Sequence, residues 1–195
     1  MTDENKISIA VLAGGKSSRM KQDKGLVMLN GKRMIEHVLD AARSVTSEII
    51  VIANSDAYQH FSFSCFPDEM TNCGPMGGIF TALKNAKTEK VLVLSCDAPF
   101  ISTEVIQKMM EQSGGENVLV AWHKGNIHPI CAIYSKKCLP ILSNKLRTGD
   151  FKLKAALEAL DAIKIVFDED EYESAFLNIN TPEDLERIQQ YHNEK

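Results

Sequence analysis

Two glycines and two cations follow the first apolar segment of this chain. Ile7 to Val11 is a short apolar run, Leu12-Ala13-Gly14-Gly15 comes directly after it, and Arg19 and Lys24 stand a little farther on. Glycines lack the Cβ atoms that keep a backbone away from a ligand, so their N–H groups can point at phosphate oxygens or a base edge. Arginine and lysine add the positive charge that a bound triphosphate requires. The chemistry that this loop favours is nucleotide binding.

The same segment also admits two other interpretations. Residues 10–17 have the spacing A-x-x-x-x-G-K-S, a relaxed form of the phosphate-binding P-loop, whose lysine would be Lys16. A P-loop leaves its strand at the first small residue, whereas this apolar run continues through Leu12 and leaves too few residues to wrap a β-phosphate. The glycine pair alone would also suit a plain tight turn. The two cations and a carboxylate farther along favour the nucleotide site, and the P-loop is the alternative mechanism.

The carboxylate is Asp97, which stands just after a second apolar run. Val91 to Leu94 predicts a central buried strand that ends in Ser95-Cys96-Asp97-Ala98-Pro99. Because the carboxyl ends of parallel strands share one edge of a sheet, we expect Asp97 to face the glycine loop. A hard anion beside a triphosphate is where Mg²⁺ would be held. Asp97 could instead cap the next helix, but Ser102 already stands at that position.

Three further segments place polar or flexible residues near the same edge. The strand predicted over 48–53 ends at Asn54, and the irregular stretch predicted over 55–77 holds Asp68. A connection of this length inside a domain is usually functional. Gly74-Pro75-Met76-Gly77-Gly78 then opens a helix, where exposed N–H groups form a second candidate contact for an anion or a base. The same glycines would equally suit a simple helix start.

Two further short segments later in the chain hold candidate site residues. His128-Pro129 lies between two predicted strands, where a lone histidine is either structural or lines a pocket. Asn178 and Asn180 come just before Thr181. Thr181 as N-cap, Pro182 at N1 and Asp184 at N3 predict the start of a helix. These asparagines are therefore expected at the edge of the pocket.

Hydrophobic periodicity places all of these residues on a single α/β domain over 1–195, in which 1–6 are expected to be flexible. Right-handed β-α-β crossovers predict a three-layer α/β/α fold around a mostly parallel, Rossmann-like sheet. The predicted strands are 7–12, 48–53, 91–94, 118–122, 130–134 and 163–167. The predicted helices cover 35–42, 79–86, 105–110, 139–142 and 151–160, followed by the last helix from Thr181.

Composition and charge limit the classes of partner that the chain is expected to bind. The chain has 195 residues, 44% hydrophobic and 25% charged, which is ordinary for a globular protein. A net charge of −4 gives no long-range attraction for nucleic acid, so no nucleic-acid partner is expected. The first apolar run is too short for a signal-peptide core or a membrane span. No membrane partner is therefore expected. The five cysteines form no C-x-x-C pair, which favours reduced thiols, as in a cytoplasmic protein.

Five motifs, in the same order along nearly the whole chain, resemble the molybdenum cofactor guanylyltransferases. They are Leu12-Ala13-Gly14-Gly15-Lys16-Ser17-Ser18-Arg19-Met20 with Asp23-Lys24, Gly74-Pro75-Met76-Gly77-Gly78-Ile79, Cys96-Asp97-Ala98-Pro99-Phe100, His128-Pro129, and Asn178-Ile179-Asn180-Thr181-Pro182. The first motif alone belongs to the wider nucleotidyltransferase superfamily. The Asp-Lys ending, G-P-M-G-G-I and N-I-N-T-P make the narrower assignment more specific. Lys21 stands where glycine is common after Arg-Met. Met34 follows Lys32-Arg33 where Pro-Leu is usual, a change at the helix entry that is expected to be harmless.

The resemblance implies a nucleotide-diphospho-sugar transferase-like fold and transfer of GMP from Mg-GTP to molybdopterin or Mo-molybdopterin, with release of pyrophosphate. It implies molybdoenzymes or their chaperones as recipients of the product. The nucleotide side would comprise Leu12, Ala13, Gly14, Gly15, Lys24, Asn54, Asp68, Gly78 and Asp97. The catalytic residues would be Arg19, Lys24 and Asp97, with Mg²⁺ on Asp97. The pterin side would comprise His128, Asn178 and Asn180.

Guanine offers N1–H and an amine to a carboxylate, and adenine offers no such pair. Asp68 could therefore read the base or could contact the ribose. The competing functions are a sister nucleotidyltransferase that uses CTP or a sugar phosphate, a P-loop nucleotide-binding module, and a catalytically inactive binding partner. The presence of both Lys24 and Asp97 disfavours the last of these.

Overall fold

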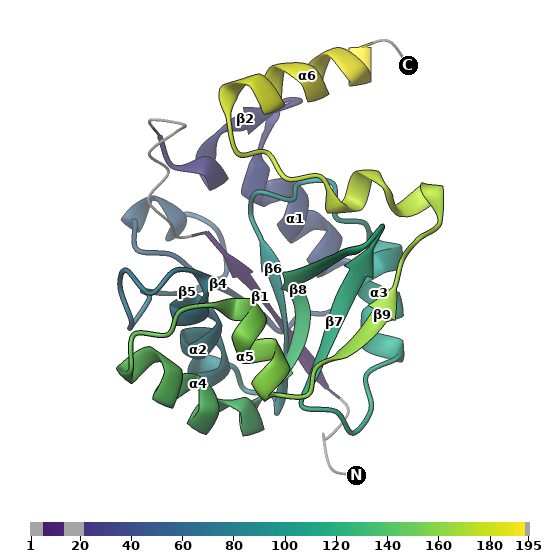
Figure 1. Cartoon of the computed structure of the whole chain (residues 1–195). Coiled ribbons are helices and arrows are strands. Elements are labelled where there is room, and N and C mark those ends of the chain that lie inside the picture. Colours follow the sequence, from purple (N-terminus) through teal and green to yellow (C-terminus); the bar gives the residue numbers. More distant parts are fainter. Residues whose placement is uncertain (1–5, 14–21, 194–195) are drawn as a thin grey trace.

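A seven-stranded sheet in the order β5-β4-β1-β6-β8-β7-β9 runs through the molecule, and helices cover both of its faces (Figure 1). The computed structural model describes residues 6–13 and 22–193. The strands are β1 (Ile7–Leu12), β4 (Ile49–Ile52), β5 (Ser64–Phe66), β6 (Lys90–Ser95), β7 (Val118–His123), β8 (Asn126–Ser135) and β9 (Ile163–Val166). Neighbouring strands are parallel except where β8 is involved, which runs antiparallel to β6 and β7. The predicted mostly parallel α/β/α fold is confirmed.

The helices divide between the two faces of the sheet. They are α1 (Met34–Arg43), α2 (Pro75–Asn85), α3 (Thr103–Glu111), α4 (Leu139–Arg147), α5 (Leu153–Ala159) and α6 (Pro182–Asn193). Buried residues of α1 and α3 pack with one face of the sheet, and those of α2, α4 and α5 pack with the other. Every residue of β1 is buried, as expected for a parallel strand covered on both sides.

A smaller apolar cluster supports α6. The two short strands β2 (Met28–Leu29) and β3 (Lys32–Arg33) form a hairpin, and the buried side chains of Leu29 and Met34 pack with Ile179 and Ile188. Figure 1 shows α6 beside β2, above the sheet. The chain therefore returns at its end to the segment that follows the first loop.

The ends of three strands lie in one row. Leu12 pairs with Ile52 on β4 and with Ser95 on β6. The hydrogen bonds continue past the strands, because Ala13 N donates to Ile52 O at 2.9 Å and Cys96 N donates to Leu12 O at 3.1 Å. Asp97 therefore follows β6 next to the exit of β1, as the sequence predicted.

The structure corrects three details of the sequence interpretation. Residues 55–77 are not irregular throughout, because they contain β5, which extends the sheet beyond β4. His128 and Pro129 lie inside β8 and not between two strands. The pairing of β8 with β7 jumps there, from Ala132 opposite Val120 to His128 opposite Ala121. The predicted strands also omit the hairpin of β2 and β3, whose turn residue Gly31 has φ +81°.

Two predicted helix starts are confirmed. Ser102 Oγ accepts from Val105 N at 3.4 Å at the start of α3. At the start of α6, Thr181 Oγ1 accepts from Asp184 N at 3.1 Å, while Asp184 Oδ2 accepts from Thr181 N at 3.0 Å. All five cysteines lie in the described residues and are free thiols. In this part of the chain we find no helix that combines the length and the apolarity needed to cross a bilayer.

Candidate active site

Three charged or polar side chains from distant segments meet at the carboxyl edge of the sheet. Lys24 Nζ donates to Asn180 Oδ1 at 2.6 Å and lies 3.9 Å from Asp97 Oδ2. Lys24 follows the loop after β1, Asp97 follows β6, and Asn180 precedes α6. The side chains of Lys24 and Asp97 are 23% and 21% exposed, so a ligand can reach them while most of each side chain is fixed by the protein. Asp97 thus lies beside the segment that follows β1, as expected from the sequence, and the functional roles of the three residues stay predictions.

The backbone holds Asp97 beside the asparagine segment. Ile179 N donates to Asp97 O at 2.8 Å, and the Ile179 side chain is fully buried under α6. Asn178 and Asn180 flank this anchor on either side. Asn178 lines a cavity next to Asp97, and Asn180 binds Lys24. One buried isoleucine thus places both asparagines at the site.

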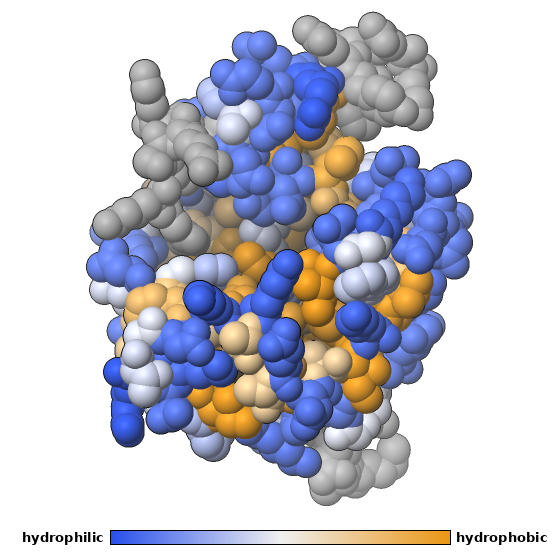
Figure 2. Space-filling model, viewed as in Figure 1, coloured by the Kyte–Doolittle hydropathy of each residue, from blue (hydrophilic) through white to orange (hydrophobic). Residues whose placement is uncertain are grey.

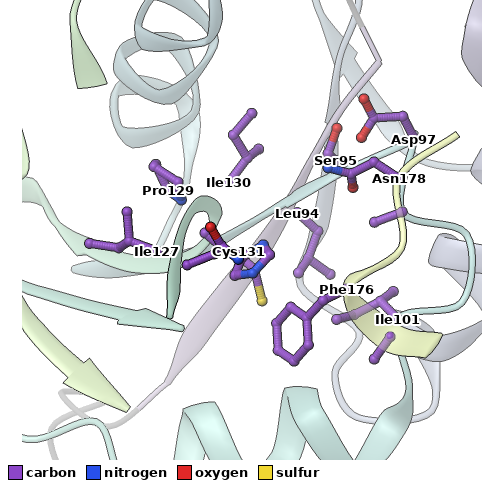
Figure 3. A pocket seen from close by; sticks show the side chains of 14 residues that line it. Leu94, Ser95, Asp97, Ile101, Ile127, Pro129, Ile130, Cys131, Phe176 and Asn178 are labelled. Atoms are coloured by element: carbon purple, nitrogen blue, oxygen red, sulfur yellow. The ribbon is translucent and has the colours of Figure 1, made fainter. Parts of the chain in front are cut away.

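A cavity of about 360 Å³ extends from Asp97 toward β8. Figure 3 shows Asp97, Ser95 and Asn178 together on one side of it, with Ile127, Pro129 and Ile130 across from them. Figure 2 shows apolar residues at the surface over the part of the sheet that holds β7 and β8. The cavity therefore combines a polar end near Lys24 with a largely apolar wall. Such a site suits a ligand with both a charged group and a ring.

The wall of the cavity contains a histidine with an unusual environment. The His128 ring lies 4.6 Å from the Phe176 ring, and His123 stacks on Phe176 at 4.9 Å. Burial lowers the pKa of His128, and the neighbouring His123 lowers it further. Within the described residues, His128 Nε2 is buried and has no hydrogen-bond partner. A neutral ring nitrogen of this kind can be satisfied by a bound ligand.

On the other side of β1, Asn54 and Asp68 are joined. Asn54 Oδ1 accepts from Asp68 N at 2.8 Å. Asp68 Oδ1 accepts from Met70 N at 2.9 Å and from Thr81 Oγ1 at 3.3 Å. The carboxylate is thereby fixed beside the beginning of α2, where Gly77 allows a close approach: a Cβ at that position would stand 2.5 Å from Met70 O and 2.9 Å from Asp68 Oδ1.

The loop between β1 and the 3-10 turn Lys24–Leu26 is described only in part. Leu12 and Ala13 are buried at the end of β1, whereas Gly14, Gly15 and Arg19 lie outside the described residues. Gly78 is buried, and a Cβ there would stand 3.2 Å from the Leu12 side chain. Close packing of α2 on β1 thus explains this glycine, and its contact with a nucleotide stays a prediction.

Residues 9–163 match the MobA-like NTP transferase domain. This chain belongs to that family. Among curated relatives, the probable molybdenum cofactor guanylyltransferase of Flavobacterium johnsoniae is 37% identical, with 90% of this chain and 92% of the relative covered. The molybdenum cofactor guanylyltransferase of Vibrio parahaemolyticus is 34% identical, with 97% and 98% covered. A solved structure of molybdopterin-guanine dinucleotide biosynthesis protein A from Archaeoglobus fulgidus is 25% identical and has a TM-score of 0.84, covering 97% of this chain and all of that one (100%).

The residues of this family member fit one kind of metal site. Nucleotidyltransferases generally use a divalent metal, and Mg²⁺ is usually bound by one or two carboxylates together with substrate phosphates. Asp97 supplies one carboxylate beside Lys24. No group of three His, Cys, Asp or Glu side chains able to hold a metal occurs among the residues that the structure describes. A single carboxylate is the kind of ligand that shares Mg²⁺ with substrate phosphates.

Tyr58 also supports the site, although no motif in the sequence contains it. Tyr58 is 1% exposed and its hydroxyl donates to Asp23 Oδ1, next to Lys24. A lone tyrosine in a polar stretch gives no periodic signal. Only the folded chain brings residues 23 and 58 together.

Proposed function

We propose that this protein is a molybdenum cofactor guanylyltransferase, with residues 1–195 forming one nucleotidyltransferase domain. It transfers GMP from GTP to the terminal phosphate of molybdopterin or Mo-molybdopterin and releases pyrophosphate. The names of the relatives that cover nine tenths or more of this chain support this assignment. The substrates are then GTP and the pterin phosphate, and the product passes to molybdoenzymes or their chaperones.

The reaction is an in-line displacement that needs no covalent enzyme intermediate. A phosphate oxygen of the pterin attacks the α-phosphorus of GTP, the new P–O bond forms, and the bond to the oxygen that bridges to the β-phosphate breaks. Positioning and charge neutralisation supply most of the catalysis in such transfers. Lys24 and Arg19 are proposed to neutralise the phosphates. Asp97 would hold Mg²⁺, which when bound supplies further neutralisation of the phosphate charge.

The observation that carries this proposal is the meeting of Lys24, Asn180 and Asp97 beside the exit of β1. A cation 3.9 Å from a carboxylate is held where both can contact one polyphosphate, the cation directly and the carboxylate through a metal. Asn54 and Asp68 are proposed to hold the base and ribose on the β4 side. The cavity toward β8 is proposed to take the pterin, with His128, Asn178 and Asn180 facing it.

The P-loop alternative has less support. Ala10, the first residue of that pattern, lies in the middle of β1 and pairs with Ile50 and Val93 on the two neighbouring strands. A P-loop would have to leave the strand at this point. The first small residue of the pattern therefore lies inside a strand and does not begin a loop.

The direct test is to incubate the protein with labelled GTP, Mg²⁺ and molybdopterin and to look for the dinucleotide and pyrophosphate. Competition with unlabelled CTP, ATP and GTP identifies the base, and only GTP is expected to suppress labelling strongly. Replacing molybdopterin with a sugar phosphate tests the acceptor. A product formed from CTP or a sugar phosphate, and not from GTP and molybdopterin, would show a sister nucleotidyltransferase.

A further inference from the structure

A buried hydroxyl contacts the residue that precedes Lys24. The Tyr58 hydroxyl donates to Asp23 Oδ1, and Gly25 N donates to the same oxygen at 3.2 Å. Asp23 and Gly25 are the two neighbours of Lys24 in sequence. The single oxygen therefore fixes the backbone on both sides of the lysine and caps the 3-10 turn Lys24–Leu26.

The close approach of Tyr58 depends on the glycine. Gly25 is buried, and a Cβ at this position would overlap the Tyr58 hydroxyl and stand 3.2 Å from Cζ of the ring. Tyr58 itself ends the 3-10 turn Asp56–Tyr58, which starts two residues after Asn54, and its ring packs on Phe61 at 6.0 Å. The contact thus links the end of β4 to the segment after β1.

The Asp23 carboxylate and the Lys24 ammonium group contact different partners. Asp23 is a carboxylate next to Lys24 in sequence, and its Oδ1 is turned toward a hydroxyl and an amide N–H. The ammonium group of Lys24 extends instead to Asn180 and Asp97. Burial strongly raises the pKa of Tyr58, and the hydrogen bond to Asp23 raises it further, so the hydroxyl keeps its proton and remains a donor.

We propose that Tyr58 is a positioning residue for nucleotidyl transfer, which directs Lys24 toward the phosphates by holding the Asp23 carboxylate. The inference rests on the proposed function, because it requires Lys24 to act on GTP. Tyr58 itself acts through Asp23 and Lys24 and is assigned no contact with substrate.

The first measurement is steady-state kinetics of Tyr58→Phe. The substitution keeps the buried ring and removes only the hydroxyl, so one donor to Asp23 is lost. We expect kcat to fall about tenfold, since a lysine with more freedom stabilises the transition state less, and the KM for GTP to change less than about threefold. Ile106→Val is the matched control: Ile106 is fully buried in α3, and its shortening should lower Tm without lowering kcat.

A double-mutant cycle tests whether the effect passes through Lys24. In the Lys24→Ala background, Tyr58→Phe should lower kcat by less than about twofold, because no lysine is left to position. Asp23→Asn keeps an oxygen acceptor and should retain most of the activity, whereas Asp23→Ala should lose as much as Tyr58→Phe. Combining Asp23→Ala with Tyr58→Phe should then cost no more than the worse single change.

The outcomes separate the two proposals. An active wild type with an unimpaired Tyr58→Phe variant overturns this inference alone. So does an equal tenfold loss in the Lys24→Ala background, or a loss in Asp23→Asn as large as in Asp23→Ala. A wild type that forms no dinucleotide from GTP and molybdopterin refutes the proposed function, and the inference falls with it.

Discussion

The two halves of the sheet meet the site in different ways. In the half made of β5, β4, β1 and β6, all strands are parallel, so the site receives the residues that follow strand ends, such as Asn54 and Asp97. In the other half β8 runs in the opposite direction, so its beginning meets the site. His128 and its neighbours therefore form a wall within a strand. Under the proposed function, the nucleotide would be held by segments that follow strands, and the acceptor by β8 together with the segment before α6.

Substitution of Lys24 should give the largest effect on kcat. Lys24→Ala removes the ammonium group that stands between the nucleotide side and the cavity, and kcat should fall about a thousandfold. Its side chain is partly exposed, so the variant should fold with nearly unchanged Tm.

The control for this variant is Lys87→Ala. The Lys87 side chain is 84% exposed and pairs with Glu48, just before the start of β4, and its loss should leave kcat unchanged.

Lys16→Ala distinguishes the proposed nucleotide loop from the P-loop alternative. A larger loss in Lys16→Ala than in Lys24→Ala would favour the P-loop and contradict the division into two halves.

The next largest effect is expected at the end of β6, where the halves join. Asp97→Asn removes the charge that would hold Mg²⁺ and keeps nearly the same shape, so kcat at saturating Mg²⁺ should fall about a hundredfold. Titration of activity against Mg²⁺ should also show a higher half-saturating concentration. Asp161→Asn, at an exposed turn, serves as the matched loss of one carboxylate. Unchanged Mg²⁺ dependence in Asp97→Asn would refute the metal assignment.

A pair of conservative variants tests the two halves against each other. Asp68→Asn keeps an oxygen for Met70 N and Thr81 Oγ1 but loses the charge, and the KM for GTP should rise about tenfold. His128→Phe keeps a ring against Phe176 but loses the ring nitrogen, and the KM for molybdopterin should rise about fivefold. Each variant should leave the other KM within about twofold. If either variant changes both constants equally, the assignment of one substrate to each half is wrong.

The parallel half was also the easier one to predict from the sequence. Its strands are continuous apolar runs, and parallel topology alone places their ends together, so the approach of Asp97 to the exit of β1 followed from pattern. The exception is β5, whose three residues give no periodic signal and which forms because β4 offers an edge to pair with.

The other half depended on tertiary structure. Pro129 lacks an N–H, which disfavours a central strand position, and β8 accommodates it where its pairing with β7 is interrupted. The hydrogen bond from Tyr58 to Asp23 and that from Lys24 to Asn180 join residues 35 and 156 positions apart. The motifs identified Lys24 and Asn180 separately, and only the folded chain determines how they meet.

The smallest expected effect is a pH dependence of Tm that is caused by His128 in β8. The pKa of His128 is lowered in the folded protein from its ordinary value of 6.5, so the unfolded chain binds more protons at this residue as the pH falls. Stability from this group is therefore present above about pH 6.5 and is lost as the pH falls toward the lowered pKa. His123 is the neighbouring titratable group, and Asp97 lines the same cavity. Tm measured between pH 7.5 and 5 should fall less in His128→Phe than in the wild type, by about one to three degrees. Identical pH profiles of Tm would show that the histidine is not held neutral by its burial.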